Sequence, residues 1–223
     1  DITNPASPQI VGSVDTPGDA ADVAISGDFA YVADGYSGFQ IIDITNPASV
    51  QIVGSVDTPD IAYGAAIAAD YAYVADDHSG LQAIDITNPA SPQLVGNVDT
   101  PGYAVGVAIS GSYAFVADYG SGLQVIGITN AASPQLVGNV DTPGYAVGVA
   151  ISGSYAFVAD YSLGLQVIDI TNPTSPQIAG SVNTPGYAQD VAISGSYAFV
   201  ADYTYGLQVI DITNPASPQI VGS

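Results

Sequence analysis

The sequence contains no lysine, arginine, cysteine, methionine or tryptophan. Because no basic residue offsets the 21 acidic residues, all of them aspartate, the formal net charge is −21 at pH 7. Nucleic acids and anionic lipid surfaces carry charge of the same sign, so we expect the chain to bind neither. The charge makes cations, including calcium, the natural small partners, and we expect no other cofactor.

The sequence also lacks cysteine and any long apolar run, and each absence excludes a class of protein. Without cysteine, no disulfide can stabilise the fold, and the sequence does not indicate a redox compartment. No apolar run approaches the roughly 18 residues of a membrane-spanning helix, so we expect no membrane insertion. The sequence shows no signal peptide and starts within a repeat, which indicates a mature or excised piece.

What the sequence does contain is a repeat with a constant period of 42 residues. The motif DITNP, or its degenerate copy GITNA, begins at Asp1, Asp43, Asp85, Gly127, Asp169 and Asp211. A fixed period of this length is typical of a solenoid or a propeller, whose units bury their faces only against their neighbours.

Residues 103–144 illustrate one repeat. Segments of alternating or β-branched composition, separated by turn signals, predict strands at Ala104–Ser110, Tyr113–Asp118, Leu123–Thr129 and Gln135–Asp141. Four short strands in about 42 residues are typical of a propeller blade. Along the second strand, aromatic side chains share one face and Ala and Val share the other, so neighbouring blades would interdigitate.

We therefore predict an all-β fold, a five-bladed β-propeller of 42-residue, four-stranded blades whose ring is closed by a terminal strand. It forms a single domain over residues 1–223, with blades at about 19–57, 61–99, 103–141, 145–183 and 187–223.

The fourth-strand segment occurs six times, and residues 1–13 are identical to residues 211–223, so one end segment is surplus. We favour closure by residues 8–15, with Gln9–Asp15 as the outer strand of the last blade. In the alternative, Gln219–Ser223 fills its own blade and the N-terminal strand pairs with another molecule. The chain would then self-associate through this surplus strand, as a self-assembling surface or filament protein.

Three stretches resemble the LVIVD repeat family: GLQVIDITNPTSPQ at Gly164–Gln177, LVGNVDTPGYA at Leu94–Ala104 and VAISGSYAFVAD at Val107–Asp118. The resemblance covers essentially the whole chain. It implies a β-propeller of bacterial or archaeal surface or secreted proteins, and hence an extracellular or cell-surface location. The family has no defined catalytic motif, so the resemblance supplies no site residues. We expect a binding or structural module and no enzyme.

In a propeller, the loop between blades and the loop from the second to the third strand emerge on the same face. Here that face would gather Tyr and Asp, a platform on which a sugar or peptide ring can stack beside hydrogen-bond acceptors. The candidates for weak, multivalent binding of a glycan or protein are Tyr103, Asp118, Tyr119, Tyr145, Asp160, Tyr161, Tyr187, Asp202 and Tyr203. Alternatively, each of these aspartates caps the turn that follows its strand.

Metal binding and catalysis have weaker support. One aspartate per repeat would form a ring around the axis, which gives the weak calcium candidates Asp34, Asp76, Asp118, Asp160 and Asp202. Asp22 and Asp190 replace glycines of the other repeats, and such a like-charged pair is the only basis for a hydrolase that uses channel carboxylates. We favour the alternative that both are solvated in the channel. His78, the only histidine, is interpreted as a loop residue.

Overall fold

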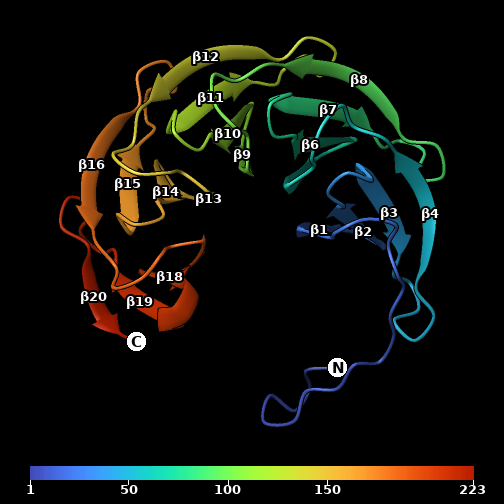
Figure 1. Cartoon of the computed structure of the whole chain (residues 1–223), viewed down its shortest axis with the longest axis horizontal. Coiled ribbons are helices and arrows are strands. Elements are labelled where there is room, and N and C mark those ends of the chain that lie inside the picture. Colours follow the sequence, from blue (N-terminus) through green and yellow to red (C-terminus); the bar gives the residue numbers. More distant parts are fainter.

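The computed structural model describes all 223 residues and contains five antiparallel sheets of four strands each. The sheets lie side by side in an arc, like the blades of a propeller, and we number them blades 1 to 5 in chain order (Figure 1). In each blade the strands follow their sequence order. The first strand lies nearest the centre around which the blades curve, and the fourth strand lies at the outer rim.

The strands have nearly the same bounds in every blade. Blade 1 contains β1 (Asp22–Ser26), β2 (Phe29–Ala33), β3 (Phe39–Asp43) and β4 (Gln51–Val56), and blade 2 contains β5 (Gly64–Ala68), β6 (Tyr71–Ala75), β7 (Leu81–Asp85) and β8 (Gln93–Val98). Blade 3 contains β9 (Gly106–Ser110), β10 (Tyr113–Ala117), β11 (Leu123–Gly127) and β12 (Gln135–Val140), and blade 4 contains β13 (Gly148–Ser152), β14 (Tyr155–Ala159), β15 (Leu165–Asp169) and β16 (Gln177–Val182). Blade 5 contains β17 (Asp190–Ser194), β18 (Tyr197–Ala201), the 3₁₀ helix η1 (Tyr203–Tyr205), β19 (Leu207–Asp211) and β20 (Gln219–Gly222). No helix has the length and apolar character needed to cross a bilayer.

The DITNP motif forms the loop between the third and fourth strands. In blade 1, Oδ1 of Asp43 accepts hydrogen bonds from the Thr45 amide at 2.9 Å and the Thr45 hydroxyl at 2.7 Å. These bonds lower the pKa of Asp43. The short aspartate side chain reaches backbone two residues away, which explains its place at a turn. Blade 3 lacks this pair of bonds because Gly127 replaces the aspartate.

The core is divided into separate clusters at the four junctions between neighbouring blades. Between blades 2 and 3, Tyr73 and Leu81 pack on a surface that includes Ala114, Val116 and Ile126. All five side chains are almost fully buried. The predicted packing of an aromatic face against a face of small side chains is thus confirmed. It explains why the middle two strands of an inner blade are apolar on both faces.

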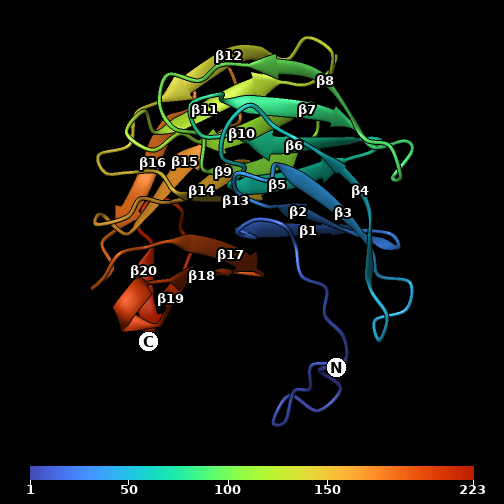
Figure 2. The same cartoon turned by 45° about the vertical axis from the view of Figure 1, so that its right-hand side comes forward.

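The arc does not close into a ring. Val23 and Ile25, on the free face of blade 1, are 55% and 62% exposed. On the free face of blade 5, Leu207 is 52% exposed, whereas the corresponding Leu123 in blade 3 is completely buried. The ends of the arc lie apart in two views (Figures 1 and 2). The structure therefore contains the five four-stranded sheets that we predict, but no closed five-bladed ring.

The predicted closing strand is wrong. Residues 8–15, including Gln9–Asp15, form no strand, and Ile10 is 93% exposed. The outer position of blade 5 is already occupied by β20, which pairs with β19. β20 immediately follows the other strands of its own blade, so it reaches this position through a short loop. The first half of the alternative, that the C-terminal copy fills its own blade, is confirmed.

The open arc predicts that the same substitution has unequal effects at its middle and at its end. Phe115 is 2% exposed between blades 3 and 4, whereas the corresponding Phe199 of blade 5 is only half-buried. Phe115→Ala should cost about 3–5 kcal/mol of unfolding free energy, and Phe199→Ala clearly less, because less packing is lost. Denaturant unfolding of the two variants measures the difference. Equal losses would contradict the open arc.

Candidate functional site

The loops between blades meet the loops between second and third strands, as predicted. Tyr119, which follows β10, forms an antiparallel bridge with Ala146, which precedes β13. The Tyr119 amide donates to the Ala146 carbonyl at 2.9 Å, and the Ala146 amide donates back at 3.0 Å. The bridge recurs between Tyr161 and Ala188. Each bridge joins two blades and fixes the two loops beside each other.

These bridges bring six tyrosines into one continuous row, which we call the tyrosine arc. It consists of Tyr103, Tyr119, Tyr145, Tyr161, Tyr187 and Tyr203. Two pairs that span a blade junction are stacked: Tyr119 and Tyr145 have ring centroids 4.2 Å apart with 5° between their planes, and Tyr161 and Tyr187 are 4.5 Å apart at 14°. The remaining neighbours in the arc are tilted, with centroids 5.7–6.2 Å apart. All six tyrosines were candidates from the sequence, and the structure brings them together.

The rings of the arc are accessible to solvent. Tyr103, Tyr145 and Tyr187 are 42–44% exposed, and Tyr203 is 67% exposed. Tyr119 and Tyr161 are half-buried by their stacked partners. A row of accessible aromatic rings can stack on flat apolar faces of a ligand.

Three of the tyrosines also adopt an unusual backbone conformation. Tyr119, Tyr161 and Tyr203 have φ angles of 48–50°, in the left-handed region that favours glycine. Glycine does occupy this position in blade 1, at Gly35 with φ 58°. A tyrosine there carries a conformational cost of about 1 kcal/mol or more, and such a cost suggests that its side chain has a function.

The candidate aspartates Asp118, Asp160 and Asp202 lie beneath the arc, fully buried. Oδ1 of Asp118 accepts from the Thr100 hydroxyl at 2.6 Å, and Oδ2 accepts from the Gly102 amide at 2.8 Å. The same pair of bonds recurs at Asp160 and Asp202. Burial raises the pKa of Asp118 and Asp160, and these hydrogen bonds partly oppose the shift.

These carboxylates therefore hold the loop between blades in place instead of contributing to the exposed surface. The bonded loop leads directly into Tyr103, so Asp118 positions a member of the arc. The sequence suggested that each aspartate caps the turn after its own strand. In the structure, its main partners lie 16 and 18 residues earlier in the chain.

The five calcium candidates do not gather into a metal site. Asp34, Asp76, Asp118, Asp160 and Asp202 occupy equivalent buried positions, one in each blade. The structure contains no group of three or more His, Cys, Asp or Glu side chains that could hold an ion.

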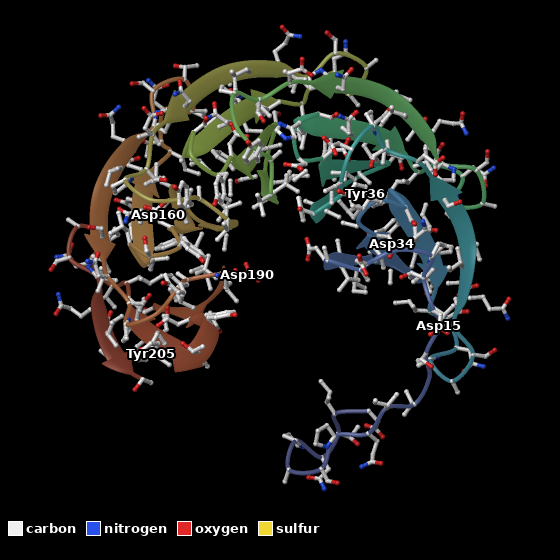
Figure 3. All side chains as sticks on the ribbon, in the orientation of Figure 1. Asp15, Asp34, Tyr36, Asp160, Asp190 and Tyr205 are labelled. Carbon is white, nitrogen blue, oxygen red and sulfur yellow. The ribbon has the colours of Figure 1, made fainter.

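Asp22 and Asp190 both line one cavity of about 360 Å³, which lies at the centre around which the blades curve. Asp22 accepts from the Ala65 amide at 2.9 Å, and Asp190 accepts from the Val191 amide at 2.8 Å. Partial desolvation raises the pKa of Asp190, although the residue still reaches solvent, and the charge of Asp22 adds to the shift. Figure 3 shows Asp190 directed toward the middle of the arc. The rest of the lining is Ala, Gly, Val, Gln and Tyr63, so the phenol hydroxyl of Tyr63 is the one side-chain hydroxyl beside the carboxylates.

A second cavity, of about 410 Å³, opens beside Tyr103, at the first end of the tyrosine arc, and the sequence did not predict it. It is lined by Tyr63, Asp77, His78, Tyr103, Val105 and Tyr119. His78 packs edge-on against Tyr103 with ring centroids 4.3 Å apart. Burial raises the pKa of Asp77, an effect that His78 partly opposes. The available signal was the irregular second repeat, in which Tyr63 replaces the Val105 of the next blade and Asp77 replaces Tyr119.

The LVIVD repeat profile matches the chain at residues 1–16, 17–58, 61–100, 101–142, 143–184 and 185–223. The chain belongs to the LVIVD repeat family. This confirms the resemblance noted in the sequence. No curated protein shows significant sequence similarity to this LVIVD chain.

Solved structures support the propeller-like arrangement of the LVIVD repeats. A functionally unknown protein from Desulfotomaculum acetoxidans superposes with a TM-score of 0.74 at 16% identity, covering 94% of this chain and 71% of that protein. The β-propeller domain of Cps50 (Swd1) from Myceliophteria thermophila has a TM-score of 0.74 at 13% identity, covering 96% and 73%. The computationally designed Ika8 protein has a TM-score of 0.63 at 9% identity, covering 90% and 73%. At these identities the likeness concerns the fold alone.

Removal of a buried carboxylate tests its role beneath the arc. Asp118→Ala leaves the Thr100 hydroxyl and the Gly102 amide without their acceptor, so unfolding free energy should fall by about 2–4 kcal/mol. Asp70→Ala, at an exposed turn, is the control and should change stability by less than about 0.5 kcal/mol. Denaturant unfolding measures both. Similar values for the two variants would refute the role of Asp118.

The raised pKa of Asp190 predicts a specific pH dependence. Its charged form is disfavoured in the fold, so its contribution to stability is greatest below the unfolded pKa and is lost as pH rises through the folded pKa. Asp190→Asn should therefore raise the melting temperature at about pH 7 and match the parent chain near pH 3. Asp211→Asn is the control of opposite sign: its pKa is lowered by Thr213, so this variant should melt earlier at neutral pH. Thermal melts of the parent chain and both variants between about pH 3 and pH 7 test this prediction. An Asp190→Asn variant less stable than its parent at neutral pH would contradict it.

Proposed function

We propose that this LVIVD protein is a non-enzymatic binding module whose tyrosine arc binds a neutral polysaccharide chain. The observation that carries the proposal is the unbroken row of six accessible tyrosine rings that crosses two blade junctions. Aromatic rings stack on the apolar faces of sugar rings, and the phenol hydroxyls can exchange hydrogen bonds with sugar hydroxyls.

The repetition of the site favours a polymeric ligand. Stacked pairs recur at consecutive junctions, at Tyr119 with Tyr145 and at Tyr161 with Tyr187. Several weak contacts along one chain give a much larger combined affinity, because each contact raises the local concentration for the next. The cavity beside His78 and Tyr103 lies at one end of this track and has room for a sugar unit.

The net charge of −21 restricts the chemistry of the ligand. An acidic polysaccharide would be repelled, so a neutral one fits better. The same charge favours a second candidate, a basic protein segment held over the rings by cation–π contacts. The two differ in salt dependence, because stacking on a neutral sugar is little affected by ionic strength whereas attraction to a basic segment is screened.

Asp22 and Asp190 each accept a backbone amide, from Ala65 and Val191, and this structural use of both carboxylates supports a binding role over hydrolysis. A polysaccharide ligand also fits the extracellular or cell-surface location that we infer from the family resemblance. Fractionation of cells that produce the protein tests that location.

Substitution within the arc tests the binding function. Tyr145→Ala removes an exposed ring and its stacked contact, so affinity for a neutral polysaccharide should fall about tenfold, and Tyr145→Ala with Tyr187→Ala further. Tyr197→Ala is the matched control, because Tyr197 is 43% exposed but lies on the free face of blade 5, outside the arc. Affinity electrophoresis and calorimetry measure binding, with circular dichroism to confirm the fold. If the folded parent chain binds no neutral polysaccharide on a glycan array, the proposal fails.

A further inference from the structure

The cavity beside Tyr103 lies where the repeated stacking of tyrosines is interrupted. At the next junction, Tyr119 stacks on Tyr145 with ring centroids 4.2 Å apart. Tyr103 is the counterpart of Tyr145 one repeat earlier, but Asp77 occupies the position of its stacking partner. A cavity of about 410 Å³, lined by both residues, lies there instead. It is formed between blades 2 and 3, in the interior of the arc, and it follows from one departure from the repeat.

The backbone around Asp77 is the same as in the other repeats. The Asp77 amide donates to the Ala104 carbonyl at 3.1 Å, and the Ala104 amide donates back at 3.0 Å, in the bridge that Tyr119 forms with Ala146. The φ angle of Asp77 is 46°, close to the 49° of Tyr119. The departure therefore exchanges a ring for a carboxylate and leaves the two loops in place.

Three tyrosine rings form much of the lining. Tyr63 precedes β5, Tyr103 precedes β9 and Tyr119 follows β10, so the rings come from three separate segments of the chain. The ring of Tyr63 is particular to this cavity, because the next repeat has Val105 at that position. Tyr103 lies 5.7 Å from Tyr119 and 4.3 Å from the imidazole of His78, measured between ring centroids. Tyr63 and Tyr103 are 36% and 42% exposed, so a ligand can reach them.

The remaining polar group of this lining is a carboxylate without a counter-charge. Asp77 is partly buried, and burial raises its pKa; His78 opposes the shift and the charge of Asp60 adds to it. Asp118 has a hydroxyl and an amide as partners, whereas no hydrogen bond to the Asp77 carboxylate contributes to its pKa. The chain has no lysine or arginine to pair with it. A bound cation would supply the missing charge.

The same lining favours one class of cation. A hard metal ion needs several oxygen ligands close together, and no group of three or more metal-ligating side chains is present. A primary ammonium brings three N–H donors and a guanidinium five, and each donor needs an acceptor. A quaternary ammonium has no N–H group. Its methyl groups pack on aromatic rings, and its charge is attracted to their faces.

We infer that this cavity binds a small organic cation with a quaternary ammonium group, held against the rings of Tyr63, Tyr103 and Tyr119 with its charge beside Asp77. The volume falls within the range of about 300–1,000 Å³ that is usual for small-molecule sites. A neutral sugar unit would fit the same space but leave the carboxylate without a counter-charge. The site is therefore a second function, which shares two rings with the polysaccharide track and does not depend on it.

The net charge of −21 favours a free cation as the source of this group. The field of the protein attracts cations, whereas it repels a carrier in which the quaternary ammonium is linked to a phosphate. Choline and phosphocholine differ in this one respect, so they distinguish the two sources.

Proton NMR of the full chain tests the site with choline as the probe. His78 is the only histidine and lines the cavity, so its imidazole signals report binding there. Choline should shift these signals to saturation. Dimethylbutanol, the uncharged carbon analogue of choline, should bind at least about tenfold more weakly, and phosphocholine should also bind more weakly. A shift that rises without saturating shows only diffuse attraction and overturns the site. Equal binding of dimethylbutanol overturns the role of charge, and equal or tighter binding of phosphocholine overturns the assignment to a free cation.

Variants of the lining test each contact. Asp77→Asn should weaken choline binding at least about tenfold, since it removes the charge beside the ligand. Asp141→Asn is the matched control, because it removes one charge from an exposed loop between blades 3 and 4, and it should bind like the parent chain. Tyr63→Phe should keep the affinity and Tyr63→Ala should lose most of it, because the ring is the contact. Asp77→Asn that binds like the parent chain, or like weakening by Asp141→Asn, contradicts the site.

Asp77→Tyr separates this site from the proposed polysaccharide binding. It restores the residue of the following repeats, so the new ring should stack on Tyr103 and fill the cavity. Choline binding should be lost, whereas affinity for a neutral polysaccharide should stay the same or rise. Circular dichroism confirms the fold. Unchanged choline binding overturns the inference, whether or not the parent chain binds a polysaccharide.

Discussion

The packing of one sheet face on the next is the interaction on which the whole structure depends. A single blade has two apolar faces and can bury neither alone, so each junction supplies half of the core of the blades on either side. The core is therefore a series of separate clusters. Blades with nearly the same sequence consequently differ in burial according to their place: Leu123 is inaccessible, whereas Leu207 is half exposed. Stability in such a chain belongs to the junctions more than to the repeats.

The candidate binding surface is a product of the same junctions. Each stacked tyrosine pair takes one ring from the end of a second strand and the other from the loop that opens the next blade. The bridge between Tyr119 and Ala146 fixes the backbones, and the buried Asp160 ties the incoming loop, through Thr142 and Gly144, to the strand beneath it. The arc of rings therefore exists only where blades stack, and it lengthens with each added blade. A surface built in this way suits an extended ligand better than a compact one.

The chain has no basic residue to pair with its aspartates. Their carboxylates instead accept hydrogen bonds from backbone amides and threonine hydroxyls. At the DITNP loops, Asp43 and its counterparts bind an amide and a hydroxyl two residues on, which lowers their pKa. At the ends of the second strands, Asp118 and Asp160 accept bonds while fully buried, and this burial raises their pKa. Both sets of residues are aspartates, and they differ in how far their carboxylates are exposed to solvent. Glutamate, one methylene longer, would not fit these short turns as well.

The sequence alone determined the strands, the four-stranded blade, the stacking of aromatic on small side chains and the face that holds the tyrosines, because period-two alternation and a constant repeat specify local structure directly. It did not determine whether the ring closes, since closure depends on the angle at each junction, which packing sets and no motif encodes. With identical end segments, the sequence favoured Gln9–Asp15 over Gln219–Ser223 as the outer strand, and the tertiary structure reversed this choice by pairing the second and leaving the first unpaired. The burial of Asp118 was likewise decided by a loop 16 to 18 residues away, because only the folded chain brings Thr100 and Gly102 to its carboxylate.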